Sequence, residues 1–493
     1  MKIPIIAFLF ICSAFSSALA TGSQLKKSQP HQGRGLVNIV AKPRLGHYIV
    51  VFKEYVDIDD AKQHLFKLEM DKTISHSIDS WFWDPPRLQM LPESDGTPII
   101  WYSTPLSDDH VNNLRTDPMV EYVEEDQTFN LGVIEGDDSF ESGGLDNKEG
   151  GDVTTRDSTW ALARVTHRQW TQNERDNPSF VYQNDDGQGV TAYVIDTGVN
   201  IHHPEFEGRA SYGKSFVRDN EDGHGEMRSA DDENGHGSHV ASLIAGKTYG
   251  VAPKASVVAV RVLDKNGSGT LSDVISGITW VVKEHLRKGR TTKSVMNLSL
   301  GSDKSPTVNR AVNSAVSSGV HVVVAAGNSF DDACDYSPAG ASDVITVGAT
   351  TFDDSLAFFS NFGKCVDIYS PGHKITGAWL GKELRTISGT SMASPMVAGV
   401  VSSFLSRGDY VDPKSLRSLL AQVATRDALD GLLDDSVNLL SYTCPVESST
   451  DHCSKGAGDS SSLFDDLFFT LGFGTVQRTL QSLGGNLFRY NLA

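Results

Sequence analysis

Three residues whose types together perform acyl transfer stand beside apolar segments of this chain. Asp196 ends one apolar run, His236 opens a second, and Ser391 precedes a third. A serine hydroxyl becomes a nucleophile when a histidine takes its proton and a carboxylate orients that histidine. Ser391 also lies where a helix is expected to begin. Unpaired backbone N–H groups and the positive end of the helix dipole would stabilise an oxyanion there.

Each of these residues also has a structural alternative when it is considered alone. Ser391 could be only an N-cap, Asp196 a turn residue, and Asn328, which follows a strand-like run, a turn cap. The flanking residues weigh against these alternatives, because any one motif can arise by chance whereas four in one order rarely do. The motifs are Asp196-Thr197-Gly198, His236-Gly237-Ser238-His239-Val240-Ala241, Ala326-Gly327-Asn328 and Gly389-Thr390-Ser391-Met392-Ala393-Ser394-Pro395.

These motifs, in this order, resemble those of the subtilisin-like serine proteases over about residues 160–444. One departure is Ser238, where the family usually has threonine; we expect activity to survive it. Within the family the proteinase K branch is the most similar, on the segments Trp160-Ala161-Leu162-Ala163-Arg164 and Asn297-Leu298-Ser299-Leu300-Gly301. The resemblance implies that Asp196, His236 and Ser391 form a catalytic triad. It also implies that Asn328 and the Ser391 backbone N–H hold the oxyanion. Considered by itself, His239 is expected to be structural.

The same resemblance implies where a substrate would bind. Neither wall of the implied specificity pocket carries a carboxylate, so we expect cleavage after apolar or aromatic residues and not after basic ones. An edge strand would bind the extended substrate. The first pocket wall is Ser299, Leu300 and Gly301, the second is Ala325, Ala326 and Gly327, and the edge strand contains Gly267, Ser268 and Gly269.

A structural calcium ion is a further expectation from the resemblance, although the chemistry itself requires no cofactor. The carbonyls of Ser342 and Val344 and the carboxylate of Asp367 would supply hard oxygen ligands. The alternative for Asp367 is a solvated charge in a loop.

Composition and the N-terminus indicate the compartment. The chain has 493 residues, enough for several domains, and 62 acidic against 43 basic residues give a net charge of −19. That charge argues against a nucleic-acid partner. Residues 1–20 have the pattern of a secretory signal peptide, and no other stretch is long enough to cross a bilayer. We therefore expect a secreted protein, either extracellular or in a lumenal or vacuolar compartment.

Four cysteines remain after residues 1–20: Cys334, Cys365, Cys444 and Cys453. Their spacing alone leaves three pairings open. Relatives with cysteines in the contexts of Cys334 and Cys365 pair them, which favours that bridge and leaves Cys444 with Cys453.

Alternating strand and helix patterns predict two folded domains of the α/β class. Residues 47–130 predict a small ferredoxin-like unit that resembles the inhibitor prodomain of subtilisin-like proteases. Residues 159–444 predict a parallel sheet with helices on both faces. Residues 21–46 are expected to be a flexible N-terminal segment, 131–158 a flexible linker at or near the processing site, and 445–493 a tail of undecided role.

Together these patterns predict a secreted, monomeric serine endopeptidase made as a self-processing zymogen. Its partners would be protein or peptide substrates and its own prodomain, an intramolecular inhibitor. The alternative is a secreted binding protein whose triad only cleaves its own prodomain, which then stays bound.

Overall fold

In a computed structural model, the structure describes residues 42–70, 88–92, 98–131, 134–135, 147–150, 152–217, 229–408, 411–433 and 435–445. All of them belong to one unit of the chain, Val37–Ala493. The predicted signal peptide and nearly all of the predicted tail lie outside the described residues. Among the described helices, none combines the length and apolarity needed to cross a membrane.

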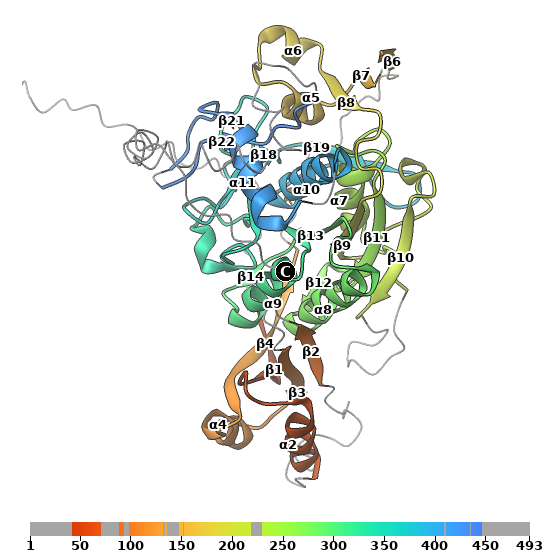
Figure 1. Cartoon of the computed structure of the whole chain (residues 1–493). Helices are drawn as coiled ribbons and strands as arrows, with labels where there is room; N and C mark the ends of the chain where they lie inside the picture. The colour runs from red at the N-terminus through yellow and green to blue at the C-terminus, as the bar shows by residue number, and fades with distance from the viewer. Residues whose placement is uncertain are drawn as a thin grey trace, which may run out of the picture. The chain divides into compact units, whose positions relative to one another are not determined.

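A nine-stranded sheet forms the centre of the large domain (Figure 1). Every pair of neighbours is parallel except β21 and β22. The parallel sheet predicted within residues 159–444 is present. In spatial order the strands are β10 (Ala210–Ser215), β11 (Ser256–Arg261), β9 (Thr191–Asp196), β13 (Ser294–Leu298), β15 (His321–Ala325), β17 (Ile345–Thr350), β18 (Ile368–Pro371), β22 (Leu439–Leu440) and β21 (Thr425–Arg426).

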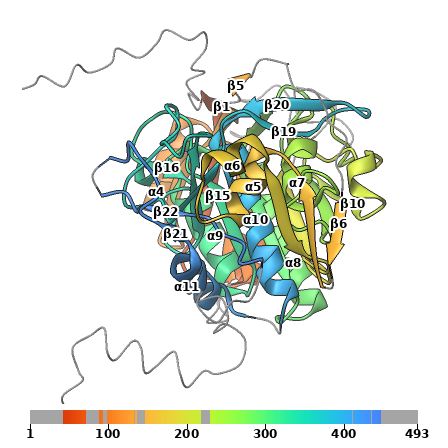
Figure 2. The ribbon, with the colours of Figure 1, turned by 90° about the horizontal axis from the view of Figure 1, so that it is seen from above.

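Helices cover both faces of this sheet, as predicted (Figures 1 and 2). Successive side chains of a strand point to opposite faces, so Val194 of β9 belongs to the core layer that contains α7 and α10, while its neighbour Ile195 belongs to the layer that contains α8 and α9. Both core layers are therefore apolar. The helices are α5 (Trp160–Thr166), α6 (Gln172–Asp176), α7 (His236–Ala245), α8 (Leu271–Lys288), α9 (Pro306–Ser317), α10 (Thr390–Ser406) and α11 (Pro413–Val423).

Short elements complete the large domain. They are the strands β8 (Ser179–Gln183), β12 (Ser268–Thr270), β14 (Ser302–Asp303), β16 (Tyr336–Ser337), β19 (Ile375–Ala378) and β20 (Leu384–Ser388), and the 3₁₀ turns Pro204–Phe206 and Ala333–Asp335. A disulfide joins Cys334 to Cys365, as expected. Cys444 is also disulfide-bonded, and its partner lies outside the described residues; the pairing with Cys453 stays a prediction.

The small domain has the predicted alternation, with the strand order β4-β1-β3-β2 of a ferredoxin-like sandwich. One face of its sheet packs on its own two helices. Ile49, Val51 and Trp101 on the other face join the core formed by α8 and α9 of the large domain. Its elements are β1 (Lys42–Phe52), α2 (Ile58–Met70), β2 (Gln89–Pro92), β3 (Pro98–Pro105), α4 (Asp108–Thr116) and β4 (Val120–Asn130).

The flexible linker predicted at residues 131–158 is wrong for its described parts. The strands β5 (Ile134–Glu135), β6 (Asn147–Gly150) and β7 (Val153–Asp157) lie in it, and β7 pairs with β8 of the large domain. The Arg156 side chain is buried, donates to the carbonyls of Lys247 and Thr248, and stacks on Phe180. Residues 153–158 therefore belong to the large domain, because β8 supplies hydrogen-bond partners that a local sequence pattern does not reveal.

Candidate active site

The expected catalytic residues lie where β-strands end and helices begin. Asp196 is the last residue of β9, His236 the first of α7, and Ser391 the second of α10. Ligands of parallel sheets bind beyond the carboxyl ends of the strands. The alternation of strand and helix therefore brings residues almost 200 positions apart to one edge of the sheet.

Asp196 and His236 form a buried pair. His236 Nδ1 lies 2.7 Å from Asp196 Oδ1, and neither side chain is exposed. The Thr197 backbone N–H also donates to Asp196 Oδ1 at 2.7 Å. A carboxylate so held fixes the proton of the imidazole on Nδ1 and leaves Nε2 to act as the base.

Ser391 lies at the start of α10, and Pro395 shapes its surroundings. Proline has no N–H, so the carbonyl of Ser391, four residues earlier, lacks its helical donor. The hydroxyl of Ser299 donates to that carbonyl at 2.9 Å. The Ser391 hydroxyl in turn donates to the Ser299 carbonyl at 3.1 Å. This exchange fixes the start of α10 to the end of β13.

His236 Nε2 has no hydrogen-bond partner among the described residues. Because the Ser391 hydroxyl is turned toward Ser299, attack on a substrate requires rotation about the Ser391 Cα–Cβ bond toward Nε2. Catalytic hydrogen bonds in ligand-free sites are often long and tighten only when substrate is bound.

Asp232 holds the motif segments of Asp196 and His236 together. Its carboxylate accepts from the Thr197 hydroxyl at 2.9 Å and from the Ser238 hydroxyl at 2.7 Å, and its side chain is buried. Ser238 therefore retains the hydroxyl contact that a threonine would make.

The two motif segments also approach each other closely. A Cβ on Gly237 would lie 2.0 Å from the Gly198 carbonyl oxygen. Only glycine fits at position 237, which explains its place directly after His236 in the motif.

Asn328 is oriented by Thr390. The Thr390 backbone N–H and hydroxyl both donate to Asn328 Oδ1 at 2.8 Å. With Oδ1 engaged in this way, Nδ2 is the atom that would donate to an oxyanion beside Ser391.

Asn361 holds the loop that carries Asn328. Its Nδ2 donates to the Ala326 carbonyl at 2.9 Å, and its Oδ1 accepts from the backbone N–H groups of Ser329 at 2.9 Å and Asp331 at 3.1 Å. The residue is fully buried. Sequence analysis missed Asn361, since it lies outside every motif.

His239 has the structural role expected of it. Its Nε2 lies 3.1 Å from the Ile375 carbonyl and 3.0 Å from the Arg385 carbonyl. Burial lowers the pKa of His239 to about 3, so the ring is neutral near pH 7 and ties α7 to the β19–β20 hairpin.

The six residues expected to form the specificity pocket line one pocket beside Ser391. None of the described residues that line it carries a charged side chain, so it suits an apolar group. Its lining comprises Ser299, Leu300, Gly301, Ala325, Ala326 and Gly327, together with Leu131, Asn328, Ser329, Tyr336, Ser337, Ala339, Thr390 and Ser391.

The C-terminal end of the small domain runs along the expected edge strand to this pocket, which Leu131 lines. Residues Thr128–Asn130 of β4 pair antiparallel with β12, where Ser268 and Gly269 lie. The Leu131 backbone N–H donates to the Gly267 carbonyl at 2.9 Å. The end of the small domain thus occupies the place expected for an extended substrate.

Two of the three expected calcium ligands, Ser342 and Asp367, are brought together, but around an arginine. The Arg417 side chain donates to the Ser342 carbonyl at 2.6 Å and to Asp367 Oδ1 at 2.5 and 3.1 Å. Val344, two residues after Ser342 in the chain, is buried. Two of the three expected ligands are thus bonded to a cation of the protein's own, so the site as built does not fit calcium.

Comparison with known proteins identifies the family. The model of the family described as "Subtilase family" matches residues 187–442. The chain belongs to the subtilase family. Similar relatives include "Alkaline protease 2" of Aspergillus fumigatus (38% identical over 455 residues, 86% of each chain) and "Subtilisin-like serine protease Pen ch 18" of Penicillium rubens (38% over 437 residues, 83% of this chain and 82% of that one).

A solved structure agrees with the family. The "Crystal structure of a cold adapted subtilisin-like serine proteinase" is similar with a TM-score of 0.53 and 41% identity, and the match covers 59% of this subtilase and all of that chain. The fold expected from the sequence is confirmed, and the chain is a serine protease of the subtilase family.

Proposed function

We propose that this subtilase is a secreted serine endopeptidase made as a self-processing zymogen. The observation that carries the proposal is the buried Asp196–His236 pair, joined at 2.7 Å, at the same sheet edge as Ser391. Asn328, oriented by Thr390, completes the set of groups that acyl transfer needs.

In the proposed mechanism His236 takes the proton of Ser391 as its Oγ attacks the scissile carbonyl. His236 then gives that proton to the leaving amine, and water repeats the sequence to release the acyl group. Asp196 orients the imidazole and stabilises its cationic form. Asn328 Nδ2 and the Ser391 backbone N–H hold the oxyanion; losing one such donor typically costs about 2.7–4 kcal/mol of transition-state stabilisation.

The uncharged pocket supports a preference for apolar or aromatic residues before the cut. A basic side chain would lose its hydration there without gaining a carboxylate. Processed protein is expected to hydrolyse chromogenic peptides ending in Phe or Leu at least tenfold better than one ending in Arg. The Ser391→Ala variant is expected to hydrolyse none of them. A preference for Arg would contradict the proposed specificity, and processing without turnover would contradict the proposed activity.

Two contacts of the small domain support its role as an inhibitor. Asp126 accepts from the backbone N–H and hydroxyl of Ser272 at 3.0 and 2.7 Å, at the start of α8. Glu124 accepts from the backbone N–H and hydroxyl of Thr307, at the start of α9. Carboxylates are favourable at helix N-termini, where N–H groups lack helical partners.

Two contacts near Ser391 flank the segment in which we propose that processing occurs. On one side Leu131 bonds to Gly267; on the other Ile134 pairs with Ser388, three residues before Ser391. We therefore place the cut between Leu131 and Ile134. Intact-mass analysis is expected to give a fragment beginning at Gly132, Val133 or Ile134 from the wild type and none from Ser391→Ala. A first cut elsewhere would contradict this placement.

Secretion rests on the signal-like pattern of residues 1–20 and on the Cys334–Cys365 disulfide, since such bonds persist in oxidising compartments. N-terminal sequencing of the unprocessed Ser391→Ala chain from culture medium tests it. A chain retained in cells with residues 1–20 attached would contradict it.

A further inference from the structure

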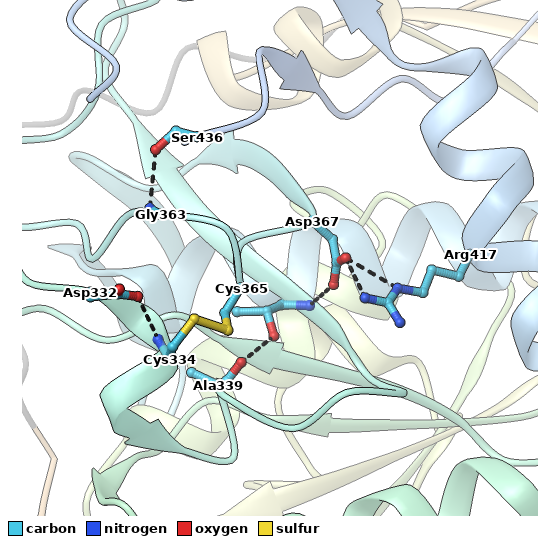
Figure 3. The surroundings of a disulfide bond; sticks show 9 residues. Asp332, Cys334, Ala339, Gly363, Cys365, Asp367, Arg417 and Ser436 are labelled. Carbon is cyan, nitrogen blue, oxygen red and sulfur yellow. Dashed lines mark hydrogen bonds and ion pairs between the residues drawn. A yellow bond between two sulfur atoms is a disulfide. The ribbon is translucent and has the colours of Figure 1, made fainter. Parts of the chain in front are cut away.

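The Arg417 side chain joins three separate segments of the large domain, and Figure 3 shows its contact with Asp367. It extends from α11 to the carboxylate of Asp367, just before β18, and to the carbonyl of Ser342, just before β17. Asp367 is itself tied to β17, because the Thr346 backbone N–H donates to Asp367 Oδ2 at 2.8 Å. One guanidinium thus connects α11 to two neighbouring strands of the central sheet.

A second cation of α11 faces the same region. Lys414 lies three residues before Arg417, and therefore on the same side of the helix. Its Nζ is 3.9 Å from Asp343 Oδ2. Asp343 and Asp367 line a pocket between the central sheet and α11. Each of these two carboxylates is therefore paired with a cation of α11.

A guanidinium can do the structural work of a calcium ion at this place. Calcium bridges segments by gathering carboxylate and carbonyl oxygens around one positive charge. Arg417 gathers the same kinds of oxygen, since its Nε and Nη2 both donate to Asp367 Oδ1 and its Nη1 donates to the Ser342 carbonyl. The arginine side chain is 34% exposed. An ion from solvent could approach, so charge repulsion and prior occupation of the oxygens, rather than lack of access, would keep it out.

We propose that Arg417 takes the place of a calcium ion in this subtilase, so that no ion binds at Asp367 unless the arginine is removed. A single substitution, Arg417→Ser, then uncovers a calcium site built from Asp367 and the carbonyls of Ser342 and Val344.

The test compares calcium binding in four full-length chains that all carry Ser391→Ala to prevent autolysis. The chains have Arg417, Arg417→Ser, Arg417→Ser with Asp367→Asn, and Asp367→Asn alone. Equilibrium dialysis is expected to give Arg417→Ser one more bound calcium than the chain with Arg417. The double variant loses this ion again, and Asp367→Asn alone leaves the number unchanged. Calcium is also expected to raise the Tm of Arg417→Ser by several degrees over its value in chelator. This rise should exceed that of the chain with Arg417, which has no calcium site at Asp367.

Lys414→Ser is the matched control, since it removes one positive charge from the same face of α11 without freeing the ligands of Arg417. It is expected to gain no calcium. The proposal is overturned if Asp367→Asn lowers the calcium content of the chain that keeps Arg417, because the ion would then bind beside the arginine. It is equally overturned if Arg417→Ser gains no ion, or if Lys414→Ser gains the same one.

Discussion

Replacing Asn361 by alanine is expected to slow catalysis although Asn361 touches no reacting atom. The side chain makes three hydrogen bonds to the loop of Asn328: to the Ala326 carbonyl and from the Ser329 and Asp331 backbone N–H groups. At about 1 kcal/mol each, their loss destabilises the fold by about 3 kcal/mol.

The effect on kcat follows from what still holds Asn328. Complete loss of one oxyanion donor costs about 10²–10³-fold in kcat. Thr390 still engages Asn328 Oδ1 with two bonds of 2.8 Å. We therefore expect part of that loss, about tenfold in kcat, which corresponds to about 1.4 kcal/mol.

Initial rates on a chromogenic peptide with Phe before the cut give kcat and KM for Asn361→Ala, Asn328→Ala and the double variant. If Asn361 acts through Asn328, adding Asn361→Ala to Asn328→Ala costs much less than tenfold. Asn438→Ala is the matched control. Asn438 also makes side-chain hydrogen bonds to a loop, at Leu429, which does not line the pocket. If the two losses multiply, or if Asn361→Ala changes only stability as Asn438→Ala does, the reasoning is refuted.

Three further outcomes follow from the structure. Asp126→Asn weakens a buried carboxylate contact of the small domain at the start of α8. The lag between processing and the appearance of peptidase activity is therefore expected to shorten about tenfold. Glu125→Gln, at an exposed position on the same strand, should leave the lag unchanged, and an equal lag in both variants would contradict the docking role. Burial lowers the pKa of His321 to about 4, although the charge of Asp412 acts to raise it. The unfolded chain therefore takes up this proton near pH 6.5 and the folded chain only near 4, so the free energy of unfolding falls by about 3 kcal/mol as pH falls through that window. Denaturant unfolding of Ser391→Ala should show a shallower fall once His321→Gln is added. Removing the Cys334–Cys365 bridge, whose cysteines are 31 positions apart, by a double serine substitution should cost about 3–4 kcal/mol, and an unchanged unfolding midpoint would speak against it.

Motifs and apolar periodicity were sufficient to place Asp196, His236 and Ser391 at the ends of strands and helices and to predict a parallel central sheet. Asp196 and Asn328 follow buried runs that are typical of parallel strands, and parallel strands bring such residues to one edge. The pocket residues were expected from the family resemblance alone, and Ser299 and Ala325 lie at the ends of neighbouring strands β13 and β15.

The residues that support the site were not predictable, because their partners are distant in sequence. Asn361 lies 33 positions after Asn328 and has no motif of its own, and its role is visible only once the loop is folded over it. Arg417 has the pattern of an ordinary charged residue on an amphipathic helix, which is usually solvated. The strand β5 is only two residues long and exists through its pairing with β20, so the acidic, glycine-rich sequence around it predicted a linker.

The central claim is that Ser391 is a nucleophile activated by His236. Labelling with a fluorophosphonate followed by peptide mapping tests it most directly, because the reagent forms a stable adduct with an activated serine. We expect one adduct per processed molecule, on Ser391, and labelling at least about 10³-fold slower when His236→Ala is present. An adduct on another residue, or an equal labelling rate without His236, would contradict the account.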